Sequence, residues 1–189
     1  MAKIDILIDG YAKKLDDGWI VNPTVVLIQN KGKNLIVDPG ADRKALLDSL
    51  EKRGLTVNDI DVVFLTHGHT DHVLLAGIFE KARVYNFTEI YEGIREWEHD
   101  NRIEELDLEI LPTPGHMPDH CSLIVPTDEG VVVVAGDVFW WVDGEEQIID
   151  IERPDQHFAS VPKALIESRK KVLEIADFII PGHGKMMRV

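Results

Sequence analysis

Short apolar runs, each of strand length and each ending in polar residues, recur along the chain. The alternation of apolar and polar positions over residues 3–9 predicts a half-buried strand. The continuous apolar runs at 25–28, 35–37 and 62–65 predict buried strands. Further strands are expected at 82–85, 106–111, 121–125, 131–135 and 178–180.

Helical periodicity occurs between several of these runs. Over residues 42–53, Leu46 and Leu50 share a face, and Gly54 supplies a stop signal. Residues 163–176 repeat the amphipathic pattern, and a short helix is expected over 73–80. Strands and helices alternate without a linker or an internal repeat, so we expect a single domain of mixed α/β class over residues 1–189.

The charge balance narrows the classes of partner. The chain has 20 Lys and Arg against 34 Asp and Glu, a formal net charge of −14. Such a surface repels phosphate backbones over most of its area, so we expect a small-molecule substrate and not a nucleic acid. Nine of the acidic residues fall within 89–109, where we expect a solvated helix or loop.

Cysteine use and hydropathy indicate the compartment. One cysteine, Cys121, excludes an intramolecular disulfide and suits a reducing environment. The N-terminus has no apolar leader, and no stretch is long enough to span a bilayer. We therefore expect a cytoplasmic protein without membrane contact, and a homodimer stays open.

The densest chemistry follows the apolar run at 62–65. Within six residues the chain carries His67, His69, Asp71 and His72. Alternate positions of an extended segment project to one side, so His67 and His69 can converge on one ion while Asp71 and His72 serve a second. The alternative is a polar loop that binds no metal, but such a high density of residues that can ligate zinc favours a metal site.

Later apolar runs end in the same way. His116, Asp137 and His183 each appear where a run stops. A lone histidine is more often structural, but the joint pattern favours a metal centre. Asp38, which follows the run at 35–37, either orients a ligand imidazole or forms a turn. His120, four residues after His116, is expected to be structural.

Together these residues resemble the metallo-β-lactamase superfamily. The match covers nearly the whole chain in the family's order: Asp38-Pro39-Gly40, His67-x-His69-x-Asp71-His72, His116, Asp137 and His183. The resemblance implies a four-layer αββα sandwich with its site along one edge. The tail over 168–184 further resembles the group of metallo-β-lactamase domain-containing protein 1.

The resemblance also implies two divalent metal ions, zinc in the first place with iron or manganese as alternatives, and no organic cofactor. It assigns His67, His69 and His116 to one ion, Asp71, His72 and His183 to the other, and Asp137 as a bridge. Three protein ligands leave a position for water, and two ions can hold a hydroxide that attacks an ester, thioester or phosphodiester. Asp71 is the expected catalytic residue, since it can orient this hydroxide and pass a proton to the leaving group.

Within the superfamily, Asp137 with His183 is similar to the thioesterase and general hydrolase branch. That branch includes glyoxalase II, but its helical glutathione domain is missing here, so a glutathione thioester is not expected. The open alternatives are iron chemistry of the persulfide-dioxygenase kind, RNA cleavage as in the protein 1 group, and a metal-bound module without turnover. The ligand types suit iron as well as zinc.

Substrate contacts are expected from the segment after Asp137. Phe139–Val142 and the acidic insert over 143–155, with Gln156, His157 and Phe158 behind it, can border the cleft. The tryptophans at 140 and 141 form an apolar wall in one interpretation, and core or a dimer contact in the other.

Overall fold

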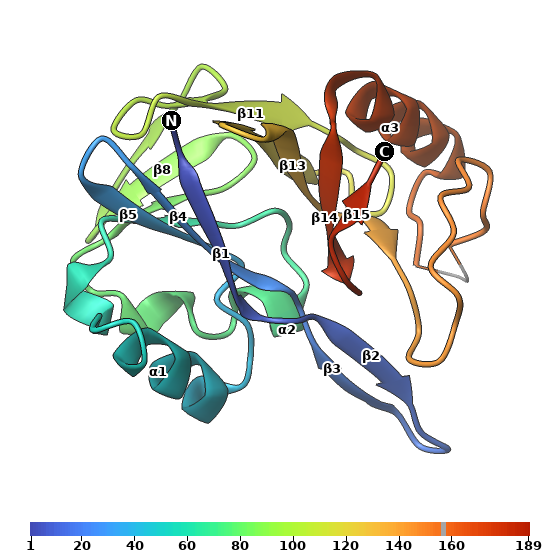
Figure 1. Cartoon of the computed structure of the whole chain (residues 1–189), viewed down its shortest axis with the longest axis horizontal. Coiled ribbons are helices and arrows are strands. Elements are labelled where there is room, and N and C mark those ends of the chain that lie inside the picture. The colour runs from blue at the N-terminus through green and yellow to red at the C-terminus, as the bar shows by residue number, and fades with distance from the viewer. Residues whose placement is uncertain (156–157) are drawn as a thin grey trace.

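The computed structural model describes residues 1–155 and 158–189. Two β-sheets pack face to face, with helices on both outer faces (Figure 1). This is the four-layer αββα sandwich that the sequence predicted. Gln156 and His157 lie outside the described residues.

Three groups of strands build the molecule. In spatial order, the first sheet contains β1 (Lys3–Ile8), β4 (Val25–Asn30), β5 (Lys33–Val37), β6 (Val62–Phe64), β7 (Arg83–Tyr85), β8 (Glu89–Glu92) and β9 (Arg95–Glu98). The second sheet contains β10 (Arg102–Ile103), β11 (Leu108–Pro112), β12 (Cys121–Thr127), β13 (Gly130–Trp140), β14 (Phe178–His183) and β15 (Met187–Arg188). A separate hairpin consists of β2 (Tyr11–Lys14) and β3 (Trp19–Asn22).

The helices connect parallel strands. They are α1 (Arg43–Glu51), α2 (Thr70–Val73) and α3 (Pro162–Ile175), with 3-10 turns η1 (Val57–Asp59) and η2 (Ala76–Ile78). The β5–β6, β6–β7 and β13–β14 pairs are parallel, so each needs a crossover. The segment that follows β6 and the carboxyl end of β14 meet at one edge of the sandwich, where Asp71 Oδ2 lies 3.5 Å from His183 Nε2.

Most central strands are buried on both faces. In β4, Val26 and Ile28 pack into the core between the sheets. Val25 and Leu27 belong to the apolar cluster on the outer face of the first sheet, which α1 covers. Strand β13 behaves in the same way, with alternate residues facing the other sheet or α3. This double burial explains why these strands appear in the sequence as continuous apolar runs.

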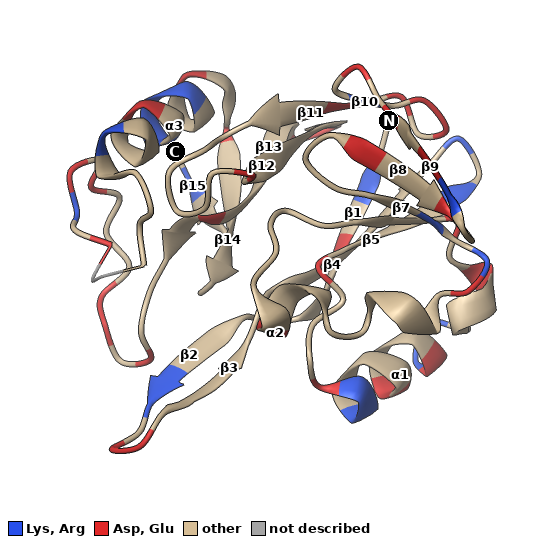
Figure 2. Ribbon diagram, turned by 180° about the vertical axis from the view of Figure 1, so that it is seen from behind, with Lys and Arg blue, Asp and Glu red and all other residues tan. Residues whose placement is uncertain are grey.

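The acidic segment over 89–109 is not the solvated helix or loop that its charge suggested. It forms β8, β9, β10 and the start of β11, because apolar side chains alternate with the acidic ones. Ile90 and Ile103 are buried in the core between the sheets, and Trp97 packs against it. Most of the acidic side chains of this segment are exposed, and their positions on β8 and β9 are coloured red in Figure 2. The alternation of apolar and acidic residues predicts strands, and it is a stronger signal of secondary structure than the number of charges.

The expected helix over 73–80 is also wrong in its bounds. Helix α2 begins at Thr70 and ends at Val73, and only the short turn η2 follows. The backbone N–H of Leu75 donates to the carbonyl of Gly40 at 3.1 Å, which replaces the bond needed to continue the helix. The chain is therefore drawn toward the loop after β5.

Two strands continue further than their apolar runs. Strand β13 reaches Trp140, and β14 reaches His183, so Asp137 and His183 belong to strands and not to the expected loops. Pairing between these strands shifts on both sides of Gly136, which has a positive φ of 54°. A Cβ at Gly136 would lie 2.8 Å from the Nε2 atom of His120, so only glycine fits this irregularity.

Among the described residues, no helix combines the length and the apolar character needed to cross a bilayer. Charged residues are frequent on α1, on α3, at the tip of the β2–β3 hairpin and in the connecting loops (Figure 2). That residues 1–189 form a single domain remains a prediction from the sequence.

Candidate metal centre

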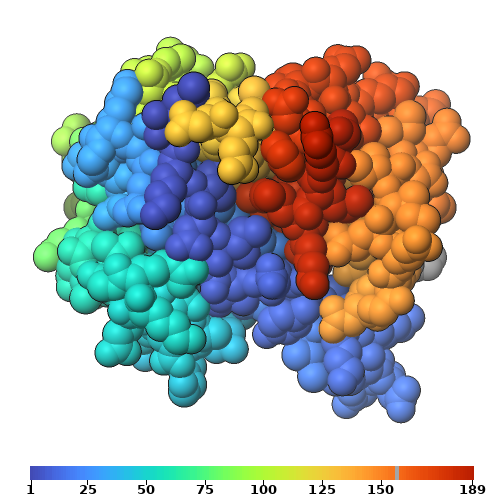
Figure 3. All heavy atoms as spheres, viewed as in Figure 1, coloured from blue at the N-terminus to red at the C-terminus, as the bar shows by residue number. Residues whose placement is uncertain are grey.

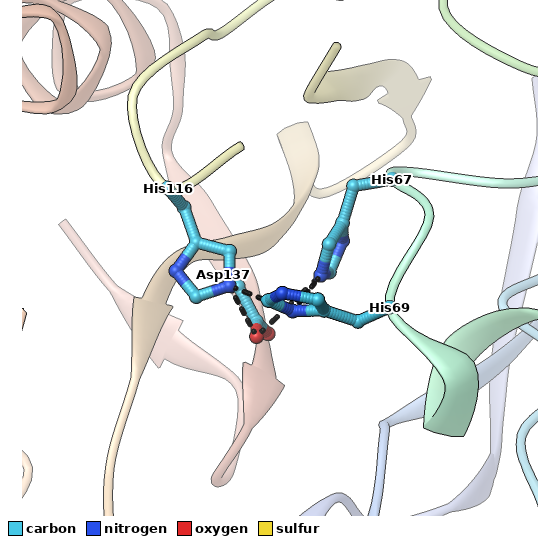
Figure 4. A group of neighbouring side chains, drawn as sticks. All are labelled: His67, His69, His116 and Asp137. Atoms are coloured by element: carbon cyan, nitrogen blue, oxygen red, sulfur yellow. Dashed lines mark hydrogen bonds and ion pairs between the residues drawn. The ribbon is translucent and has the colours of Figure 1, made fainter. Parts of the chain in front are cut away.

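The loop after β6 brings two imidazoles toward two side chains of the second sheet. His67 and His69 lie on this loop, His116 follows β11, and Asp137 lies in β13. All four side chains point toward one another (Figure 4). We call these four residues the first group. Its nitrogens are close, with 2.9 Å between His67 Nε2 and His69 Nδ1 and 3.1 Å between His116 Nε2 and the same atom.

The second group consists of Asp71, His72 and His183. Asp71 Oδ2 lies 3.6 Å from the Nε2 atom of His72 and 3.5 Å from that of His183. The first two residues belong to α2 and the third ends β14, so this group also joins the two halves of the sandwich.

Asp137 lies between the groups. Its Oδ2 atom faces His116 Nε2 at 3.3 Å, and its Oδ1 atom faces His72 Nε2 at 3.5 Å. It is 4% exposed, so its charge is removed from bulk water. The backbone of Gly182 leaves the necessary space, because a Cβ there would lie 1.8 Å from Asp137 Oδ1.

The outer nitrogens of four histidines are occupied by acceptors. His72 Nδ1 lies 2.8 Å from Asp38, His116 Nδ1 2.7 Å from Asp155, and His183 Nδ1 3.1 Å from the carbonyl of Tyr11. His67 Nδ1 contacts the Thr66 hydroxyl, whose own proton goes to Asp38. A neutral imidazole has one N–H, so each of these rings turns the lone pair of Nε2 toward the centre.

This arrangement fits metal ions. Lone pairs from several histidines and a carboxylate converge with too few protons to satisfy them. Two of these buried atoms, His72 Nε2 and Asp137 Oδ1, have no hydrogen-bond partner among the described residues. Tetrahedral ligands at zinc bond lengths lie about 3.3 Å apart, close to the spacing between most of these donor atoms. A divalent cation at each group would satisfy them.

The electrostatics favour the metal-binding form in Asp137 and His67. Burial would raise the pKa of Asp137, but His183 and His72 hold it well below its ordinary value. Burial lowers the pKa of His67 well below its usual range, and the neighbouring His72 lowers it further. A deprotonated carboxylate and a neutral imidazole are the forms that bind metals. In His72 and His116 burial opposes the charged form, but the neighbouring carboxylates raise the pKa, so a bound metal would displace a proton from these imidazoles.

His120 is structural, as the sequence suggested. Its Nδ1 atom contacts the Thr113 hydroxyl at 2.9 Å, and its Nε2 atom accepts from the backbone N–H of Asp137 at 3.1 Å. Burial lowers the pKa of its imidazole to about 3. With both nitrogens occupied, His120 positions the Asp137 backbone and offers no free ligand atom.

Two carboxylates surround the centre, and sequence reasoning found only one. Asp38 contacts His72 and also accepts from the backbone N–H of Thr66 at 2.8 Å, so it combines the two roles considered for it. Asp155 was treated only as part of an acidic insert. It is buried and contacts both His116 and the indole N–H of Trp140. Its neighbour Pro154 and its acidic surroundings gave no signal of this role.

A recess of about 260 Å³ opens onto both groups. Asp71, His69 and His183 line its polar side. The rest of its lining is mostly apolar and includes Trp19 and Trp140. The paired tryptophans therefore separate: Trp140 borders the recess, while Trp141 is buried and stacks on Phe139, with 6.4 Å between the ring centroids.

An αββα sandwich with a histidine and aspartate cluster at one edge defines a class of metal-dependent proteins. The chain belongs to the metallo-β-lactamase superfamily, whose family model matches residues 18–183. This superfamily consists generally of metal-dependent hydrolases that bind two metal ions, and dinuclear zinc hydrolases are among its members. The assignment of each residue to an ion stays a prediction.

Individual comparisons agree with this family. The chain is 34% identical to metallo-β-lactamase domain-containing protein 1 of Xenopus laevis, over 98% of this chain and 81% of that protein. It spans about three fifths of the mammalian proteins of the same name. It is 30% identical to hydroxyacylglutathione hydrolase GloC of Haemophilus influenzae, over 84% of each chain. A metallo-β-lactamase structure from Thermotoga maritima aligns over 100% of this chain and 99% of its own with a TM-score of 0.75, at 20% identity.

Proposed function

We propose that this protein is a dinuclear, zinc-dependent hydrolase of a small ester, thioester or phosphodiester. The proposal rests on one observation: several imidazoles and a carboxylate direct their lone pairs toward the centre of the site. Four imidazoles have their outer nitrogens occupied, and the buried Asp137 Oδ1 and His72 Nε2 atoms have no hydrogen-bond partner within the part of the chain that the structure describes. Imidazole and carboxylate donors of this kind suit zinc.

In this proposal, His67, His69 and His116 would hold one ion, Asp71, His72 and His183 would hold the other, and Asp137 would be available to both. Two such ions would supply an activated water at neutral pH and stabilise negative charge on the reacting oxygen. The Asp137 carboxylate, which is itself buried, would offset part of their positive charge. Asp38 and Asp155 fix the orientation of His72 and His116 through the outer nitrogens.

Asp71 has the best position to move a proton. Its side chain is 19% exposed, against 6% for Asp137, and it lines the recess. Its Oδ2 atom faces the second group, so Oδ1 is the oxygen available to the reacting molecules. There it would accept a proton from the attacking water and return it to the leaving group, as a general base and then a general acid.

The donor count favours two ions over the single iron of the persulfide-dioxygenase alternative. One ion in the first group would leave His72 Nε2 buried without a partner. A buried polar atom in this condition costs about 1–3 kcal/mol. The frog and bacterial relatives add support at the level of the family, and the name of GloC is consistent with thioester hydrolysis.

The test is elemental analysis of protein purified without added metal, followed by assays on ester, thioester and phosphodiester substrates. We expect about two zinc ions per chain and turnover of at least one substrate class. Asp137→Asn should lose both properties, and Asp107→Asn, an exposed aspartate in an ion pair with Lys31, should keep both. One iron per chain without hydrolysis of any substrate would refute the proposal.

A further inference from the structure

The apolar side of the recess is an ordered aromatic wall. Trp19 comes from the β2–β3 hairpin, Trp140 from the end of β13, and Phe158 from the segment before α3. Their ring centroids lie 5.6–6.5 Å apart, and each pair is edge to face. Three chain segments that are distant in sequence therefore meet to form one aromatic surface, which we call the aromatic wall.

Hydrogen bonds hold this wall against the candidate metal centre. The indole N–H of Trp140 donates to the buried Asp155, so the ring presents carbon and not a donor to the recess. The same ring lies 6.3 Å from the imidazole of His183. A group that packs on Trp140 is thus next to the second ion group.

The hairpin is fixed beside the segment that follows β13. The backbone N–H of Asp143 donates to the carbonyl of Ala12 at 2.8 Å, and Asp143 Oδ1 accepts from the N–H of Ala12 at 3.3 Å. Figure 3 shows the blue hairpin standing against the orange segment. Trp19 therefore stays over the recess, where it is only half-buried and can receive a ligand.

The charged side chains that line the recess are carboxylates, and the positive charge of the proposed centre would come from its metal ions. Among the described residues that line the recess there is no Lys or Arg, whereas Asp71 and Asp137 are present. Two cations pack on rings of the wall: Lys14 Nζ lies 5.9 Å from the centroid of Trp19, and the Arg153 guanidinium lies 5.9 Å from that of Trp140 while it donates to the carbonyl of Trp140 and to Glu145. Neither cation lines the recess, so a carboxylate arm inside the recess would meet Asp71 and Asp137 without a Lys or Arg partner.

We propose that the substrate is an uncharged carboxylic thioester or ester whose small apolar arm packs on Trp19, Trp140 and Phe158. This inference rests on the proposed hydrolase function and narrows its substrate class. The recess of about 260 Å³ lies just below the usual range for ligand pockets, about 300–1,000 Å³, which favours a small arm such as a phenyl group. Hydrolysis breaks the bond from the acyl carbon to sulfur or oxygen, water supplies the new oxygen, and the thiol or alcohol leaves with a proton.

The test compares N-acetylcysteamine thioesters that share one small neutral leaving group. Their acyl groups are acetyl, butyryl, phenylacetyl and succinyl, with bis(p-nitrophenyl) phosphate as the phosphodiester. We expect kcat/KM to rise from acetyl to phenylacetyl by about tenfold or more, because the aromatic arm buries apolar surface on the wall. Among the thioesters, kcat/KM should be lowest for the succinyl compound, and kcat/KM for the phosphodiester should be lower again.

Trp19→Ala is the variant of choice, because Trp19 belongs to a projecting hairpin and is not among the candidate metal ligands. It should raise KM for the phenylacetyl thioester about tenfold, change KM for the acetyl thioester much less, and leave the metal content unchanged. Tyr91→Ala removes a partly exposed aromatic ring from β8 and is the matched control, with no change expected for either thioester. Equal loss for acetyl and phenylacetyl substrates, or preference for succinyl or phosphodiester, would overturn the inference.

A binding measurement separates this inference from the hydrolase proposal. Phenylacetamide and acetamide are uncharged, and their binding is followed by tryptophan fluorescence of the metal-loaded protein. We expect phenylacetamide to bind at least tenfold more tightly, with the difference lost in Trp19→Ala. Binding with this pattern but without turnover of any substrate would refute the hydrolase while keeping the apolar site. Turnover without the pattern would refute the aromatic wall as the substrate site and keep the hydrolase.

Discussion

The two candidate ion groups share Asp137, but different parts of the molecule support them. In the second group, His72 is held by Asp38, which also accepts from the backbone N–H and the hydroxyl of Thr66. In the first group, His116 is held by Asp155, which also accepts from Trp140. Asp38 thus links the ends of β5 and β6, whereas Asp155 links the candidate metal centre to the aromatic wall.

The two carboxylates that hold the outer nitrogens, Asp38 and Asp155, therefore have different structural roles. Asp38 has a φ of 44°, in the left-handed region, and is 2% exposed, so the strand ends around it depend on its hydrogen bonds. Asp155 belongs to an irregular segment and contacts the wall of the recess. We therefore expect Asp38 to matter for folding as well as metal binding, and Asp155 to matter for metal binding and substrate.

The largest effect is expected where the two groups meet. Asp137→Asn removes the one charge that faces both, and an amide cannot offset two cations. Affinity for each ion should fall by about 100-fold or more, a larger loss than for an outer carboxylate. Titration against a chromophoric chelator measures this. Loss of only one ion would show that Asp137 serves a single group.

Asp38→Asn should weaken the second ion by about 10–100-fold and also destabilise the fold. The buried Thr66 N–H and hydroxyl would lose a charged acceptor, so the free energy of unfolding should fall by about 2 kcal/mol. Urea denaturation of the metal-free protein isolates the second effect. An unchanged unfolding midpoint would contradict the structural role assigned to Asp38.

Asp155→Asn is the matched change in the first group. It should weaken the first ion by about tenfold, because His116 loses the carboxylate that orients its ring. The free energy of unfolding of the metal-free protein should change by only about 1 kcal/mol. The acyl preference should weaken as well, because Trp140 loses the same partner. A variant with normal metal binding and normal acyl preference would show that this contact is dispensable.

The smallest effect is expected far from both groups, at Glu105. This carboxylate accepts from Tyr85 and Arg83; burial opposes its ionised form, but its hydrogen bonds and Arg83 hold its pKa below the ordinary value. A lowered pKa means that its stabilisation is present above the unfolded pKa, about 4.3, and is lost as pH falls through the folded value. Glu105→Gln should therefore cost about 1 kcal/mol at pH 7 and progressively less below about pH 4. Metal content should stay unchanged at pH 7, which makes this variant a control for the other three.

Much of the fold was accessible from local pattern. Strands buried on both faces appear as apolar runs, and the helices α1 and α3 appear as amphipathic repeats. The acidic meander over β8–β10 was missed, because its net charge obscured the alternation of Ile90 and Trp97 with acidic neighbours. The hairpin strand β2 was also missed, since four residues in Tyr11–Lys14 carry too little periodicity to define a strand.

The sequence by itself determined which side chains can reach the candidate centre. Histidine and aspartate follow the apolar runs at fixed places along the chain, and parallel strands carry their carboxyl ends to one edge. The tertiary structure alone decided which atoms face each other, which nitrogen of each imidazole points inward, and that Asp155 and Trp19 belong to the site. Their contacts join segments more than 30 residues apart in the chain, such as Asp155 with His116 and Trp19 with Trp140, so no local pattern records them.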